Sequence, residues 1–162
     1  VVRRAGPLVG KRVLVTGCGP IGALIVVAAR HAGASEIVVT DVTDQTLSRA
    51  RAVGADATHN VATHPDALDP YKADKGAFDV LFEASGNAQA LRAAFDVLKP
   101  RGIIAQVGTG GEISIPWHRR CEATDQSLFA VYRICPGVRT GGRSASVDEG
   151  AAHFCVKSPG CC

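Results

Sequence analysis

Short apolar runs alternate with longer helical patterns along the first two thirds of the chain. The apolar runs are rich in β-branched residues and have the length of buried parallel strands, which predicts strands at 11–16, 37–41, 57–60, 78–83 and 103–107. The stretches between them predict helices at 23–32, 44–53 and 87–98, and a helix or loop at 64–75. Strands that alternate with helices in this way predict an α/β fold, a doubly wound parallel sheet with helices on both faces.

The residues that flank these elements indicate where the strands meet. Thr43 and Asn87 are suitable N-caps for the second and third helices, and Gly54 is a suitable stop for the second. Right-handed crossovers place the first and fourth strands side by side and leave a crevice at their carboxyl ends. Glycine-bearing strand exits are expected to open into this crevice at 17–22, 84–86 and 108–111.

A glycine-rich turn separates the first strand from the first helix and reads G-x-G-P-x-G. In a strand–turn–helix unit, Gly17 permits the tight turn, Gly19 lets a pyrophosphate approach the backbone, and Gly22 lets the helix pack closely. Pro20 suits the first helical turn, and the positive end of the helix faces an anion. The motif by itself also fits a glycine-rich surface turn, so the prediction of a Rossmann-type nucleotide site needs a second signal.

Asp41 is that second signal, because it ends the second strand about 20 residues after the last glycine. A carboxylate there accepts hydrogen bonds from both hydroxyls of the adenosine ribose and repels a 2′-phosphate. No Arg occurs at 42–45, so NAD is the expected cofactor in preference to NADP. The alternative for Asp41 is a solvated acid at a strand end. Together the two signals predict an NAD-binding Rossmann-type domain over residues 1–117.

Composition excludes several other classes of function. The net charge is +3 and no Lys/Arg block precedes residue 119, which argues against a nucleic-acid or membrane-surface partner. The longest apolar run, 21–29, is too short to span a bilayer, and a signal-peptide pattern is missing, so a cytoplasmic protein is expected. No catalytic set of Ser, His, Asp or Cys stands out. Two roles are open for Glu83, a functional acid and an acid at a strand end that fixes a loop, and the second is favoured. His59 is given no catalytic role.

The remainder of the chain, 118–162, is predicted to be an irregular tail. It lacks sustained apolar periodicity and contains five of the six cysteines, none in a C-x-x-C pair, so neither a metal site nor a disulfide set is predicted. A reading-frame shift near 116–118 is our hypothesis for the tail. The chain contains no Met, so a processed product or a fragment is expected.

Several segments resemble the nucleotide-binding domain of the zinc-type medium-chain alcohol dehydrogenases, over about 2–116. They are 10–22, 38–41, 50–56, 78–86 and 106–108. The polyol branch, which includes idonate and sorbitol dehydrogenases, is the most similar. The resemblance implies pyrophosphate contacts at Gly17, Gly19, Pro20, Ile21 and Gly22, a ribose contact at Asp41, and nicotinamide-amide contacts at Val107 and Gly108. Many members carry Lys or Arg where this chain has Thr46, with Arg49 nearly a turn beyond.

The resemblance also implies chemistry that lies elsewhere in family members. There, an N-terminal domain holds the catalytic zinc, and a secondary alcohol of a small polyol or sugar acid becomes a ketone as hydride passes to NAD. That domain is expected to be absent here, so the chain has no predicted zinc ligands or catalytic residues and is expected to bind NAD without turnover. Full-length members are expected to be homo-oligomers that pair through an edge strand, for which 112–116 is the candidate. The alternatives are a stand-alone nucleotide-binding module and a non-functional gene remnant.

Overall fold

The computed structural model describes residues 1–108, 121–123 and 131–134. The predicted edge strand at 112–116 and most of the predicted tail lie outside the described residues. Five parallel strands form the body of the sheet: β1 Arg12–Thr16, β2 Glu36–Asp41, β3 Ala57–Asn60, β4 Phe78–Glu83 and β5 Leu98–Gln106. The helices are α1 Pro20–His31, α2 Asp44–Ala52 and α3 Ala88–Asp96, with 3₁₀ turns η1 Val2–Ala5 and η2 Asp69–Lys75.

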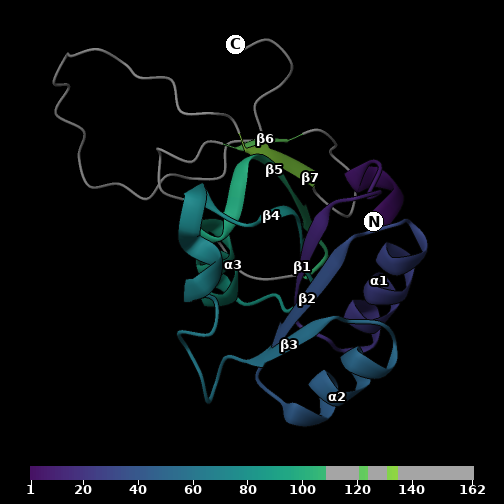
Figure 1. Cartoon of the computed structure of the whole chain (residues 1–162), viewed down its shortest axis with the longest axis vertical. Helices are drawn as coiled ribbons and strands as arrows, with labels where there is room; N and C mark the ends of the chain where they lie inside the picture. Colours follow the sequence, from purple (N-terminus) through teal and green to yellow (C-terminus); the bar gives the residue numbers. More distant parts are fainter. Residues whose placement is uncertain (109–120, 124–130, 135–162) are drawn as a thin grey trace, which may run out of the picture.

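The strand order is β3-β2-β1-β4-β5-β7-β6, which places β1 between β2 and β4 as right-handed crossovers predict. The pairs β2–β1, β1–β4, β2–β3 and β4–β5 are all parallel. Helices α1 and α2 lie on one face of the sheet and α3 lies on the other (Figure 1). The predicted doubly wound α/β fold is therefore confirmed.

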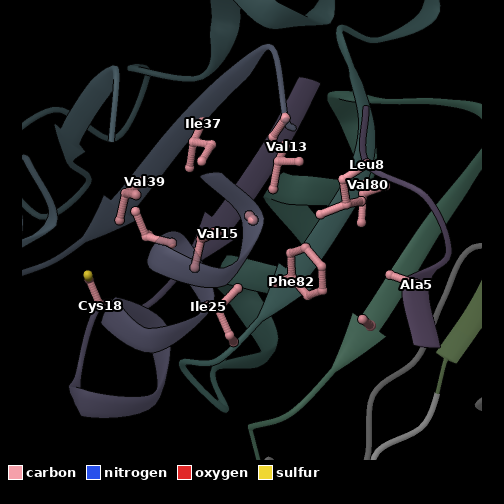
Figure 2. Close-up of a cluster of buried hydrophobic side chains, with 14 of the residues drawn as sticks. Ala5, Leu8, Val13, Val15, Cys18, Ile25, Ile37, Val39, Val80 and Phe82 are labelled. Carbon is pink, nitrogen blue, oxygen red and sulfur yellow. The ribbon is translucent and has the colours of Figure 1, made fainter. Parts of the chain in front are cut away.

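Alternating strand positions supply a separate core on each face of the sheet. Val13 and Val15 of β1 belong to the cluster that packs under α1 and α2, where Ile25 of α1 and Phe82 of β4 are also buried (Figure 2). Leu14, between the two valines, belongs to the opposite cluster with residues of α3. A strand that is buried on both faces has a continuous run of apolar residues, and such a run predicts the position of the strand clearly.

Strand β5 starts earlier than the predicted 103–107. Its register with β4 passes from Phe78↔Leu98 to Val80↔Ile103, so the residues between form an irregular excursion in the paired strand. Arg101 lies in this excursion with φ +66°, a conformation that few residues other than glycine adopt. The predicted turn at 100–102 is thus a bulge inside a strand, since β4 supplies pairing on both sides of it.

Two short strands lie within the range predicted as an irregular tail. β7, Val131–Ile134, pairs antiparallel with β5, and β6, Cys121–Ala123, pairs antiparallel with β7. β7 thus covers the edge of β5 at 103–105. In the part of the chain that the structure describes, no helix is both long enough and apolar enough to cross a membrane.

Candidate functional site

The glycine turn begins at Gly17, directly after β1. Its φ is +82°, and its N–H donates to the carbonyl of Thr40 at 2.8 Å. A Cβ at this position would lie 2.7 Å from the backbone of Ser85. Both the left-handed backbone and the close approach of another loop require glycine here, as the motif predicts for the tight turn.

Gly22 lies in the first turn of α1 and has a different reason to be glycine. A Cβ at Gly22 would overlap the carbonyl oxygen of Gly17, which belongs to the turn itself. The helix therefore approaches the end of β1 more closely than any side chain allows. This close helix–strand packing is the role that the motif assigns to its last glycine.

Gly19 is the exception, because nothing in the described protein requires a glycine there. It is the N-cap of α1 with φ −63°, and no atom lies within 4 Å of a Cβ built on it. Pro20 occupies the first position of the helix, as predicted, and Ile21 is 56% exposed. The backbone at the positive end of α1 thus borders open space, a position in which an anionic group can approach it.

Asp41, at the end of β2, is fixed against the glycine turn. Its Oδ2 accepts a hydrogen bond from the Cys18 N–H at 2.6 Å, and its Oδ1 accepts from the N–H groups of Val42 and Thr43 at 2.7 and 3.1 Å. The side chain is only half-buried. The structure therefore brings together the two signals that predicted a dinucleotide site, the glycine motif and the acid.

The thiol of Cys18 is buried at the turn, at the margin of the cluster shown in Figure 2. Burial raises the pKa of Cys18, and the negative charge of Asp41 raises it further. A thiol with a raised pKa stays protonated near neutral pH and is a poor nucleophile. Cys18 therefore has a structural role in this turn.

Val107 and Gly108 form the other side of the candidate site. Their N–H groups both donate to the carbonyl of Glu83, at 2.8 and 2.9 Å. A Cβ on Gly108 would overlap the N–H of Gly86, so the loops that follow β4 and β5 are in direct contact. With the contact between Gly17 and Ser85, the exits of β1, β4 and β5 lie next to one another; residues 109–111 lie outside the described residues.

Glu83 fixes the exit loop of β4. Its Oε1 accepts hydrogen bonds from the N–H of Ser85 at 2.8 Å, from the N–H of Gly86 at 2.9 Å and from the Ser85 hydroxyl. This is the structural role that the sequence favoured for Glu83. The sequence did not single out Ser85, which contacts both this acid and the glycine turn; its place between a strand-end acid and a glycine was the available signal.

An open hollow of about 880 Å³ lies elsewhere, beside edge strand β3. It is lined by α2, β3 and the segment before η2, and none of the predicted cofactor residues borders it. His59 lines it, with Nε2 at 3.2 Å from the Tyr71 hydroxyl. Burial lowers the pKa of His59, and the charge of Arg51 lowers it further. The hollow is thus separate from the glycine turn, and we assign it no part in the candidate site.

The described residues do not form a metal centre. No group of three or more His, Cys, Asp or Glu side chains among residues 1–108 is placed to hold a metal ion. Zinc therefore has no fitting donor set in this part of the chain. Within the described residues, the strand exits instead bring together the glycine turn, Asp41 and the loops after β4 and β5.

The sheet order and the glycine turn define a doubly wound domain of the dehydrogenase type. The chain belongs to the zinc-binding dehydrogenase family, whose family model matches residues 20–135. Over 111 residues it is 45% identical to L-idonate 5-dehydrogenase (NAD(P)(+)) of Escherichia coli. It is also 42% identical over 115 residues to L-threonine 3-dehydrogenase of Shewanella oneidensis.

Solved structures give the same relationship. The crystal structure of L-idonate 5-dehydrogenase from Escherichia coli superposes with a TM-score of 0.64 at 46% identity, covering 67% of this chain and 31% of that one. The structure of 2R,3R-butanediol dehydrogenase from Bacillus subtilis gives a TM-score of 0.59 at 29% identity, covering 69% and 33%. The sequence match to the Escherichia coli L-idonate 5-dehydrogenase covers 68% of this chain and 32% of that protein. The chain therefore spans about a third of the length of this relative.

Proposed function

We propose that this chain binds NAD at the glycine turn and corresponds to the cofactor domain of a zinc-dependent polyol dehydrogenase similar to L-idonate 5-dehydrogenase. In such an enzyme a secondary alcohol becomes a ketone as hydride passes to NAD. The observation that carries the proposal is the position of two features side by side. Gly19 leaves the backbone at the start of α1 open, and Asp41 accepts a hydrogen bond from the N–H of the preceding residue, Cys18.

The pyrophosphate is proposed to rest at the start of α1. The first N–H groups of a helix have no partner within the helix, and the helix dipole favours an anion there. Gly17 and Gly22 bring the turn and the helix close together, while the open side of Gly19 admits the phosphates. Pro20 and Ile21 complete the pyrophosphate contacts expected for this turn.

The ribose of the adenosine is proposed to bind Asp41. Each carboxylate oxygen has more than one acceptor site, so the three backbone donors leave capacity for ribose hydroxyls. A phosphate on the 2′ position would meet the same negative charge, so NAD is the proposed cofactor. The nicotinamide amide is proposed to lie against Val107 and Gly108, on the other side of the strand exits.

Zinc would polarise the alcohol oxygen in a full-length family member. The described residues offer no donor set for it, so no step is assigned to zinc here. We propose that the 162-residue chain binds NAD and does not turn over alcohols by itself. For the whole enzyme we propose a small polyol or sugar acid as substrate, a homo-oligomeric assembly and a cytoplasmic location.

Titration calorimetry of the purified chain with NAD⁺ and NADP⁺ tests the cofactor site. We expect saturable binding of NAD⁺ and at least tenfold weaker binding of NADP⁺, a difference of about 1.4 kcal/mol. The variant Asp41→Asn should reduce this preference, because it removes the charge that opposes a 2′-phosphate. Asp44→Asn is the matched control, since it removes one charge nearby on α2. A sample with the circular dichroism of a folded α/β protein that binds neither nucleotide would overturn the proposal.

A second assay addresses turnover. The chain is incubated with NAD⁺, Zn²⁺ and L-idonate, and absorbance at the NADH band is followed. We expect no sustained NADH formation, because the described residues hold no group that polarises the alcohol. Sustained formation, abolished by removal of the protein, would show that the chain is active by itself.

A further inference from the structure

A row of polar side chains crosses the parallel sheet just below the exit loops. The register pairs align one residue from each strand, namely His59, Thr40, Thr16, Glu83 and Gln106. Residues paired in register on parallel strands point to the same face of a sheet. Two residues earlier on the central strands, the same face carries Leu14, Val38, Leu81 and Ile104, which belong to the core under α3. The polar row therefore separates this apolar core from the candidate cofactor site.

Glu83 is the residue of this row that contacts both sides of the site. Its side-chain Oε1 holds Ser85 and Gly86 in the exit loop of β4, and its carbonyl holds the N–H groups of Val107 and Gly108 after β5. The residue is 1% exposed. One buried residue thus fixes the relative positions of two loops that belong to different strands.

The second carboxyl oxygen of Glu83 is not used in this network. Oε2 is buried and has no hydrogen-bond partner among the described residues, and the same holds for Oγ1 of Thr16, its register neighbour on β1. A Cβ on Gly108 would lie 2.6 Å from Oε2, so this oxygen lies directly beneath Gly108.

We propose that Glu83 is a positioning residue of the cofactor site. It holds the loops 84–86 and 107–108 in the relative placement that the nicotinamide half of NAD needs. A carboxylate oxygen accepts stronger hydrogen bonds than an amide oxygen, so Glu83→Gln should weaken the three bonds that hold residues 85 and 86. This inference rests on the proposed binding of NAD, but it concerns a residue that does not itself touch the cofactor.

Asp79 provides a matched control on the same strand. It lies at the opposite end of β4, where its Oδ2 accepts from the Arg12 N–H and its Oδ1 from the Lys99 ammonium, both at 2.9 Å. Like Glu83, it is an acid that joins β4 to a neighbouring strand. The variants Glu83→Gln and Asp79→Asn therefore both weaken strand connections, but only the first is near the exit loops.

The experiment compares the binding of NAD⁺ and of AMP, by calorimetry, to the wild type and to these two variants of the full chain. AMP lacks the nicotinamide half, so a loss that reflects the position of residues 107–108 affects NAD⁺ alone. We expect Glu83→Gln to weaken NAD⁺ about tenfold and AMP less than twofold, and Asp79→Asn to change neither by more than twofold. Equal losses for NAD⁺ and AMP would indicate general damage and overturn the proposal.

Ser85→Ala keeps the test decisive if Glu83→Gln does not fold. Ser85 is exposed, and the substitution removes only its hydroxyl donor to Glu83 and its acceptor for Asn87. We expect it to fold and to weaken NAD⁺ about threefold with AMP unchanged; unchanged NAD⁺ binding would overturn the inference. If the wild type binds AMP and NAD⁺ while Glu83→Gln matches it, the inference about Glu83 fails alone. If the folded wild type binds neither nucleotide, the proposed function fails as well.

Discussion

At the scale of single residues, the fold requires glycine at two of the three glycine positions of the turn, for two different physical reasons. Gly17 has a positive φ and packs against Ser85, whereas Gly22 leaves room for the carbonyl of Gly17. Gly19 has an ordinary φ and open space around it. The fold constrains the first two positions, whereas the proposed constraint on Gly19 is the pyrophosphate, so substitution should separate stability from cofactor affinity.

The pair Gly19→Ala and Gly22→Ala tests this separation. Gly22→Ala forces a backbone shift and should destabilise the protein by about 1–3 kcal/mol. Gly19→Ala meets no atom and should change stability by less than about 1 kcal/mol, while NAD⁺ binding weakens at least tenfold because the methyl group occupies the approach of the pyrophosphate. Urea denaturation and calorimetry measure the two effects. Unaltered NAD⁺ affinity in a folded Gly19→Ala variant would contradict the predicted role of this position.

The reactivity of Cys18 is a second prediction at this scale. Burial, followed by the charge of Asp41, raises the pKa of Cys18, so less thiolate is present at a given pH than for a free cysteine. Alkylation by iodoacetamide at pH 8, mapped by mass spectrometry, should label Cys18 at least tenfold more slowly in the native chain than in guanidinium chloride. Equal rates in the two conditions would show that the turn does not protect the thiol.

At the scale of elements, two helices with similar N-cap residues begin in different ways. The Asn87 side chain accepts hydrogen bonds from the N–H groups of Gln89 and Ala90, at 2.8 and 3.1 Å, and so caps α3. Thr43 stands at the N-cap of α2 but forms no side-chain cap bond. Asp41 instead accepts from the backbone of Thr43. The sequence predicted both cap positions, but the residue type alone did not distinguish a working cap from an unused one.

This difference predicts unequal effects of alanine at the two caps. Asn87→Ala should destabilise the protein by about 1 kcal/mol, because two N–H groups of α3 lose their acceptor. Thr43→Ala removes no cap bond and should change the free energy of unfolding by at most about 0.5 kcal/mol. Urea denaturation of both variants under the same conditions measures the difference. A larger loss for Thr43→Ala than for Asn87→Ala would contradict it.

Two short strands, β6 and β7, lie in the region that the sequence predicted to be an irregular tail. The parallel part of the sheet ends at β5, and β7 and β6 extend it to seven strands. The match to the family model also extends past residue 116, to residue 135. A reading-frame shift near 116–118 stays a hypothesis about this region. The nucleotide sequence of the gene tests it: the displaced frame should encode a continuation that resembles the family, and early stop codons there would refute it.

At the scale of the whole molecule, two aspartates connect elements that are distant in the sequence. Asp56 accepts from the Ile37 N–H at 2.7 Å and pairs with Arg30 of α1. Asp79 accepts from the Arg12 N–H and from Lys99. Burial acts to raise the pKa of both acids, but the backbone N–H bonds and then the neighbouring Arg30 or Lys99 outweigh it, so both pKa values are lowered.

These lowered pKa values predict how stability depends on pH. An acid whose pKa is lower in the folded state stabilises the protein above its unfolded pKa, and this contribution is lost as pH falls through the folded pKa. Stability should therefore fall below about pH 4, and less steeply for Asp56→Asn/Asp79→Asn than for the wild type. Thermal unfolding from pH 7 to pH 2.5 measures the slopes, with the exposed Asp66→Asn as the control. Parallel curves for the double variant and the wild type would contradict this prediction.

Much of the architecture followed from the sequence alone. β3 and β4 were predicted at their observed bounds, and β1, β2 and the three α-helices were located within a few residues, because buried parallel strands and their glycine exits leave local signals. The glycine motif and Asp41, about 20 positions apart in the sequence, were predicted to lie together, and a hydrogen bond joins them in the structure; their binding of NAD stays a prediction.

Tertiary structure decided what local patterns cannot encode. The early start of β5 depends on its pairing with β4. β7 forms by pairing with β5, and β6 forms by pairing with β7, so these features have no periodic signal in the local sequence. The hydrogen bond from Cys18 to Asp41 and the position of Glu83 beneath two loops exist only when β1, β2, β4 and β5 are assembled. Local sequence patterns located the carboxyl ends of β1 to β4. The packed sheet determined which strand ends meet, because contacts between distant segments form only when the strands lie in register.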